Sequence, residues 1–356
     1  MIRDSEGIED YENLIRKKRL IILALLILSF FLVALSLTIG STHIPVSDII
    51  KGIFGIGEKS TLIKIWEHRM PRVLGGLVAG AGLAVAGCVM QNNLKNPLAS
   101  PSTMGISAAA VFGANFAIIV LGAGVSSSHY TADFVIKNPY AVTIMAFVMA
   151  IITMSVVVVL SKKKNFAPAA TVLAGVAMGS IFSAGTMIVQ YFSTDTSLAT
   201  AVFWSFGDLG KISWKELSVL TAVVAVCSVF FYLMRWNYNA LANGDEVAKS
   251  LGVRVDKLVM AGLVLSSLIT ALCVSFMGVI GFIGLVGPQI SRRLVGEDHR
   301  FLIPASMAMG AVTLMLSDLV ARTVIAPVTL PVGAVTALIG GPMFLYLLMR
   351  GESSKC

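Results

Sequence analysis

Long apolar segments alternate with short polar ones along almost the whole chain. A helix needs about 20 mostly apolar residues to cross the hydrocarbon core, at roughly 1.5 Å per residue. Segments that satisfy this requirement lie at about 20–39, 72–91, 105–123, 141–160, 168–192, 214–234, 258–277, 302–320 and 332–349. A further apolar segment at 279–295 is short and rich in glycine, and we count it as a tenth, interrupted helix. The pattern predicts an all-α polytopic membrane protein with about ten transmembrane helices.

The composition agrees with this class of protein. Mean hydropathy is +0.87, 56% of the residues are hydrophobic and 13% are charged, whereas charged residues make up about a quarter of an average soluble protein. The net charge of +8 does not indicate nucleic-acid binding, because the basic residues are concentrated in short loops between apolar segments. Arg16-Lys17-Lys18-Arg19 precede the first apolar segment, and no small-residue cleavage site follows it, which predicts a retained span and not a signal peptide.

The distribution of basic residues predicts the orientation. With ten spans and both termini on one side, 18 of the 27 Lys and Arg residues lie on the side of the termini and nine on the other. Both termini are therefore expected to be cytoplasmic. The outer loops are then near 40–71, 124–140, 193–213 and 321–331, and 235–257 is the longest inner loop.

Cysteine and histidine indicate no cofactor or metal site. Cys88, Cys227 and Cys273 fall inside apolar segments and Cys356 is the last residue, so no pair has the spacing of a disulfide framework or of metal ligands. The histidines are scattered over loops without ligand spacing. They are His43, His68, His129 and His299.

Two arginines break the positive-inside trend at the outer end of the second segment. Arg69 and Arg72 are three residues apart, so they share one face of a helix that starts near them. Asp318 and Arg322 are four residues apart at the outer end of another segment. An outward-facing basic patch attracts acidic partners, because guanidinium groups bind carboxylates through paired hydrogen bonds. The alternative is interfacial arginines with a local pair between Asp318 and Arg322.

Several function classes lack the residues that they require. Gly52 to Ser60 is similar to a Walker A loop, but Glu58 separates the second glycine from the lysine. Apart from Asp318, the apolar segments contain essentially no acidic residue, which argues against a proton-coupled carrier. This argument does not apply to a sodium-coupled carrier whose ion sites are built from backbone carbonyls, and that alternative stays open. We find neither a nucleophile paired with a base nor a metal-binding cluster, which are the features that would indicate an enzyme.

Three stretches of the chain together resemble one family. They are Arg69-Met70-Pro71-Arg72 with the following segment through Gln91-Asn92-Asn93-Leu94-Lys95-Asn96-Pro97-Leu98-Ala99 to Ser107, then Gly278 to Pro288, and Leu330-Pro331-Val332-Gly333. From about residue 20 to 350 the chain resembles the FecCD-type permeases, the membrane subunits of binding-protein-dependent ABC importers for iron chelates, haem and cobalamin. The resemblance implies a type II ABC importer permease fold with ten helices.

The resemblance also implies roles for individual residues. Arginines matching Arg69, Arg72 and Arg322 dock glutamates of the external binding protein in that family. Residues 240–253 resemble its coupling region, in which glycine-bounded helices seat on the ATPase. The residues concerned are Ala240, Asn243, Gly244, Asp245, Ala248, Leu251 and Gly252.

Small residues recur at four-residue spacing, which lets helices approach closely in lipid. They are Gly76 and Gly80, Gly175 and Gly179, and Gly333, Ala337 and Gly341. The resemblance implies that the helices at 168–192 and 332–349 help to form a dimer or line its central pathway, and packing within one chain is the alternative. Asn96-Pro97 is either a family element at the cytoplasmic face or a plain helix stop. Many relatives have histidine at Gln289, so the role of that histidine does not transfer.

These observations combine into one functional hypothesis. Residues 1–19 are expected to form a cytoplasmic segment, 20–350 the transmembrane permease domain and 351–356 a cytoplasmic tail. The chain would import an iron chelate or cobalamin across the cell membrane, as a homodimer with an ATP-binding cassette subunit and an extracytoplasmic binding protein, in contact with membrane lipid and without a cofactor. The main alternative is an ion-coupled secondary transporter, and a membrane receptor or scaffold is a third. The sequence does not choose among siderophore, haem, cobalamin and oxyanion substrates.

Overall fold

The computed structural model describes residues 2–40, 44–124, 138–326 and 328–351, with side chains from Asp10 to Tyr346 within these ranges. Its helices are α1 (Ile2–Thr38), α2 (Val46–Ile53), α3 (Lys59–Ile63), η1 (Lys64–Arg69), α4 (Met70–Asn93), η2 (Ser102–Met104), α5 (Ile106–Ile119), α6 (Pro139–Lys163), α7 (Pro168–Tyr191), α8 (Asp195–Ser205), η3 (Leu209–Lys211), α9 (Trp214–Leu233), α10 (Arg235–Ala242), α11 (Asp245–Ser250), α12 (Val255–Met277), α13 (Ile283–Val295), α14 (His299–Thr323) and α15 (Val332–Gly351). Within the described residues the only β-type pairing is an isolated bridge between Phe206 and Val279. The predicted all-α class is confirmed.

Each apolar segment found in the sequence contains a helix, but the helices differ in length. Seven of the described helices are long and apolar enough to cross a membrane. The helix α5 has only 14 residues and α13 only 13, so at 1.5 Å per residue neither spans a full hydrocarbon core by itself. The segment 279–295, predicted as one interrupted helix, is helical only from Ile283, and Phe282 directly before it has a left-handed backbone with φ 65°. The number of ten transmembrane helices stays a prediction.

The outer loop predicted at 40–71 is largely helical. It contains α2, α3 and the π-helical turn η1, and the helix that includes α4 runs without a break from Lys59 to Asn93. The expected start of this span near residue 72 was therefore too late by about three turns. Arg69 and Arg72 lie within a continuous helix instead of at its beginning. His43, most of the predicted loop 124–140 with His129, and the tail 352–356 with Cys356 lie outside the described residues.

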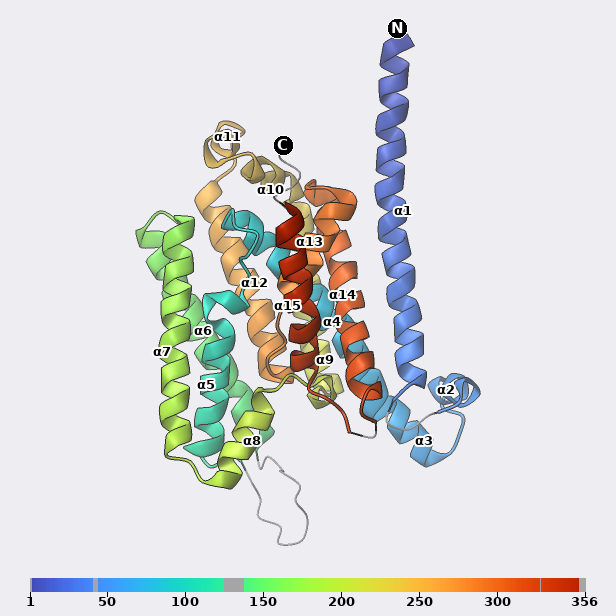
Figure 1. Cartoon of the computed structure of the whole chain (residues 1–356), viewed down its shortest axis with the longest axis vertical. Helices are drawn as coiled ribbons and strands as arrows, with labels where there is room; N and C mark the ends of the chain where they lie inside the picture. Colours follow the sequence, from blue (N-terminus) through green and yellow to red (C-terminus); the bar gives the residue numbers. More distant parts are fainter. Residues whose placement is uncertain (1, 41–43, 125–137, 327, 352–356) are drawn as a thin grey trace.

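Both ends of the chain lie at one end of the bundle. Figure 1 shows the start of α1 and the end of α15 at the top, together with α10 and α11, whereas α2, α3 and α8 lie at the bottom. A chain that crosses the membrane an even number of times has both of its ends on the same side. We call the end with α10 and α11 the inner end and the opposite one the outer end, following the orientation that the basic residues predict.

The helix α4 forms the centre of the bundle and packs against α14, α12, α13 and α9. In the apolar 18-residue stretch of the helix Lys59–Asn93 that is long enough to cross the hydrocarbon core, 78% of the residues are buried. This is possible because the helix is rich in small residues. A Cβ atom at Gly80 would collide with the backbone of Gly310 in α14, and one at Gly87 would collide with the backbone of Gly284 in α13. Because lipid gives no hydrophobic drive to helix association, such close backbone contact supplies the packing energy.

These contacts predict that an alanine substitution lowers stability at one glycine and leaves it unchanged at another. Gly87→Ala places a methyl group against the carbonyl of Gly284, whereas a Cβ at Gly281 meets no atom within 4 Å. Gly87→Ala should lower stability by about 1–3 kcal/mol, seen as a lower melting temperature of the detergent-solubilised chain. Gly281→Ala is the matched control and should melt like the parent. Equal melting temperatures for the two variants would contradict the packing described here.

Candidate functional site

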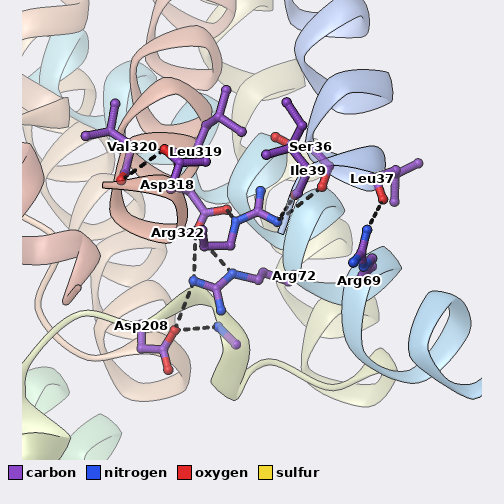
Figure 2. A network of polar contacts seen from close by, with 12 residues as sticks. Ser36, Leu37, Ile39, Arg69, Arg72, Asp208, Asp318, Leu319, Val320 and Arg322 are labelled. Atoms are coloured by element: carbon purple, nitrogen blue, oxygen red, sulfur yellow. Dashed lines mark hydrogen bonds and ion pairs between the residues drawn. The ribbon is translucent and has the colours of Figure 1, made fainter. Parts of the chain in front are cut away.

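A network of charged side chains connects three parts of the chain at the outer end. Arg72 of α4 donates through Nη2 to Asp318 of α14 at 2.8 Å, and its Nη2 lies 3.5 Å from Oδ1 of Asp208, just before η3. Asp318 also pairs with Arg322 one helical turn later, with 2.9 Å between Oδ2 and Nε. Figure 2 shows Arg72 between the two aspartates. Asp318 thus joins two arginines from different helices.

Two arginines of this network also bind the end of α1. Arg322 donates through Nη1 to the carbonyl oxygens of Ser36 and Ile39, at 3.1 and 2.9 Å. Arg69 donates through Nη1 to the carbonyl of Thr38 at 3.1 Å and also to that of Leu37. The last carbonyls of a helix have no partner within the helix and form the negative end of its dipole. The two guanidinium groups therefore satisfy and neutralise the C-terminus of α1.

Most of this network is withdrawn from solvent. Arg69 is 8% exposed, Arg322 4% and Asp318 2%, while the side chains of Arg72 and Asp208 keep 14% and 43% exposure. The network thus has a buried side and an open side. Its open side is formed by Arg72 and Asp208, and this is where a charged group from outside finds access.

The sequence prediction grouped the right arginines but not all of their partners. The local pair between Asp318 and Arg322 is confirmed. The carbonyl groups of α1 and the carboxylate of Asp208 were missed, because nothing in the spacing of the chain relates the outer loop at 193–213 to α4 or α14. The docking role of the arginines stays a prediction.

At the inner end, α10 and α11 form the loop predicted to couple to an ATPase. Gly244 separates the two helices with φ 116°, and Gly252 follows α11 with φ 82°, a left-handed region that favours glycine. Ala248 is fully buried, whereas Leu251 is 68% exposed. Asp245 pairs with Lys95 at the end of α4 at 2.8 Å. The loop therefore presents Leu251 outward, and the solvent-exposed pair of Asp245 with Lys95 connects it to the end of α4.

A second attachment connects α10 to α14. Asn239 accepts through Oδ1 from the backbone N–H and Nδ1 of His299, and donates through Nδ2 to Asp298. Burial raises the pKa of Asp298, but the hydrogen bonds from Asn239 and from the backbone N–H of Arg300 outweigh it and hold that pKa below its usual value. Asp298 thus stays ionised as the N-cap of α14. The sequence placed His299 in a loop without metal-ligand spacing and gave no indication of its contact with Asn239.

The glycines predicted to pack have neighbours within the chain. A Cβ at Gly175 would lie 2.7 Å from Cα of Met104, and one at Gly179 would lie 3.4 Å from Cα of Gly105. Gly333 lies against the backbone of Val279 and Gly207, whereas Gly341 has only the ring of Phe282 near it. In each glycine pair, at least one glycine thus packs closely against another part of the same chain. A role of these glycines in a dimer stays a prediction.

The polar turn after α4 lies beside α13. Asn96 accepts through Oδ1 from the backbone N–H of Leu98, which closes the turn before α5. Gln289 donates through Nε2 to the carbonyl of Pro97 at 3.0 Å. Gln289 therefore holds this inner turn against α13.

Comparison with known proteins decides the family. The model of the FecCD transport family matches residues 25–350. The chain belongs to the FecCD transport family. An ABC transporter permease protein of Methanocaldococcus jannaschii is 46% identical over 339 residues, covering 95% of this chain and 97% of that protein. The haemin transport system permease of Yersinia pestis is 34% identical, covering 93% and 97%.

A solved structure supports the fold of this FecCD permease. The inward-facing conformation of a metal-chelate type ABC transporter is similar with a TM-score of 0.78 and 30% identity, covering 94% of this chain and 99% of that chain. Relatives are named as permeases for iron(III) citrate, haemin and cobalamin. The chain is thus a membrane permease of the ABC importer class, and the resemblance noted in the sequence is confirmed.

The outer network predicts a large loss of stability when one partner is removed. Arg322→Met would leave the buried Asp318 with one cation instead of two and would remove the donor to the carbonyls of Ser36 and Ile39. Breaking a buried ion pair in this way costs about 3–5 kcal/mol. Thermal unfolding of the solubilised FecCD permease should show this loss. Lys51→Met, at an exposed lysine of α2, should leave the melting temperature unchanged, and a similar effect of both variants would refute the prediction.

Proposed function

We propose that this permease translocates an iron chelate, with a siderophore or haem as the first candidates and cobalamin as the next. It would do so as a homodimer in the cell membrane with both termini cytoplasmic. The substrate would arrive on an external binding protein, and ATP hydrolysis on a separate subunit would drive the transport cycle. Family membership carries this proposal, because relatives named for these substrates cover nearly the whole chain.

The inner loop supports coupling to a separate ATPase. An exposed Leu251 beside a buried Ala248 gives a short helical element with one face for a partner and one for the permease. The attachments of Asp245 to Lys95 and of Asn239 to Asp298 connect this element to α4 and α14. A force on the loop would therefore reach the two helices that carry the outer network.

The helix α7 supports a dimer. Only 6% of the apolar 18-residue stretch of α7 is buried within the chain. An open groove of about 500 Å³ runs between α7 and η2. Gly175, Gly179 and Ala184 line this groove, and Ile181 and Met187 are more than 60% exposed. Small residues bordered by large apolar ones form a typical surface for helix association in lipid.

The outer network supports docking of an acidic binding protein through Arg69, Arg72 and Arg322. Arg72 retains the most exposure of the three, so an incoming carboxylate would first compete with Asp208 for it. Arg69 and Arg322 would reach such a carboxylate only by releasing carbonyl groups of α1. Docking would then loosen the attachment of α1, which gives the binding protein a direct effect on the permease.

Reconstitution tests the proposed function. The chain and its co-purifying ATPase subunit are placed in proteoliposomes, and ATP hydrolysis is measured with and without binding protein loaded with ferric siderophore, haem or cobalamin. Stimulation by one loaded protein is the expected result and identifies the substrate. Uptake that follows an ion gradient without any ATPase subunit would favour the secondary-transporter alternative. The mass of the solubilised complex should correspond to two permease copies, and a single copy would overturn the dimer.

Leu251→Glu tests the coupling loop in the same vesicles. A charge on the exposed face should reduce substrate uptake at least ten-fold while the chain still folds, because Leu251 is 68% exposed. Lys164→Glu, in the inner loop between α6 and α7, is the control and should transport normally. Normal uptake by Leu251→Glu would show that this face does not contact the ATPase.

Arg72→Gln tests docking at the outer end. Loss of this partly exposed guanidinium should weaken association with the binding protein by roughly ten-fold or more, as for a charged pair at an interface, and Arg72→Lys should recover part of the affinity. Melting temperatures of both variants separate a docking defect from unfolding. Unchanged association of Arg72→Gln with the binding protein would rule out the docking role of this residue.

A further inference from the structure

A groove of about 450 Å³ opens at the inner end between α9 and α12. Phe230, in the last turn of α9, and Met234, directly after this helix, form one wall, and Leu258 and Ala261, in the first turns of α12, form the other. Its rim carries Arg254 and Lys257. The groove thus has apolar walls and a basic mouth.

The two cations at the mouth are available to a ligand. Arg254 and Lys257 are both exposed, and among the described residues neither takes part in an ion pair. No acidic side chain lines the groove. Asp256 lies between Arg254 and Lys257 in the chain and is also exposed, but it does not line the groove. The two cations that do line it therefore exceed this carboxylate by one charge, which suits an anion.

Neighbouring aromatic residues place this mouth at the level of lipid headgroups. Tyr232 and Trp236 are 41% and 56% exposed, and the guanidinium of Arg235 lies 4.5 and 5.7 Å from their ring centroids. Exposed tyrosine and tryptophan concentrate at the boundary between hydrocarbon and water. The mouth therefore faces the region where phosphate groups of lipids lie.

The apolar wall continues from the groove along the membrane surface of α9. Val226 is one turn before Phe230 on the same face and is 69% exposed, and Val229 is 58% exposed. An acyl chain that starts at the groove would find an uninterrupted apolar path. A soluble protein seated at the mouth would leave this path uncovered, so the combined shape favours a lipid.

We propose that this groove binds one anionic phospholipid of the membrane. Its phosphate lies between Arg254 and Lys257, and one acyl chain follows Phe230 and Val226. Basic pockets between transmembrane helices at the cytoplasmic side bind anionic headgroups in this manner. Because Leu251 and Gly252 also line the groove, the bound lipid would contact the end of α11.

Native mass spectrometry of the purified full-length chain tests the site, with palmitoyl-oleoyl phosphatidylglycerol and the phosphatidylcholine of the same acyl chains as probes. The parent should bind one phosphatidylglycerol more tightly than phosphatidylcholine. Arg254→Gln with Lys257→Gln should weaken phosphatidylglycerol binding about 30-fold, from the usual effect of two basic residues at an anionic surface. Lys162→Gln with Lys163→Gln removes the same charge from the exposed end of α6 and should bind like the parent.

Four results would overturn the proposal. One is unchanged phosphatidylglycerol affinity in the groove variant, and another is an equal loss in the control variant. The third is unchanged lipid affinity with lost binding of an ATPase subunit, which would make the groove a protein-docking surface. Photoactivatable phosphatidylglycerol on the parent chain gives a readout that needs no variant. Cross-links should map to residues 226–237 and 251–261, and cross-links confined to other segments would also refute the site.

Discussion

The structure depends on the direct backbone contact between α4 and α14. Gly80 and Gly310 leave no space for a side chain between the two helices, and in lipid such close contact replaces the hydrophobic effect as the source of association. The same two helices carry Arg72 and Asp318 at the outer end. At the inner end, Lys95 after α4 and Asp298 before α14 bind Asp245 and Asn239 of the inner loop. The two candidate sites are therefore ends of one packed unit and not independent features.

The outer network explains why charged side chains are tolerated so far from water. An isolated buried charge is expensive, but each arginine here has a carboxylate or helix-terminal carbonyls as partners. The C-terminus of α1 supplies the negative end of a helix dipole, and the carbonyls of Leu37 and Thr38 at this end accept hydrogen bonds from Arg69. Removing α1 would leave two cations without these partners. The network is thus a structural connection of α1 to the bundle, whether or not it also docks a protein.

The sequence predicted the helical segments well because crossing lipid requires long apolar runs that are visible in the chain. It also predicted the Asp318 and Arg322 pair, since four-residue spacing is a local property. It could not predict that Asp208 meets Arg72 or that Asn239 meets Asp298, because these contacts join residues far apart in the chain. The helical structure of 46–69 was missed for a different reason. Its residues are too polar for the hydropathy criterion, although α2 is an amphipathic helix with Ile49 buried.

Transport requires some parts of the permease to move, and the packing indicates which parts can. Sliding of α4 along α14 or α13 would drive glycine backbones into one another at Gly80 and Gly87, so these helices are expected to move together. In contrast, α7 is largely uncovered, and on α15 Leu338 is 75% exposed. Rearrangement at these surfaces breaks few contacts within the chain. A force applied at the inner loop would consequently move α4 and α14 as one body, and the change in shape would occur where α7 and α15 meet their surroundings.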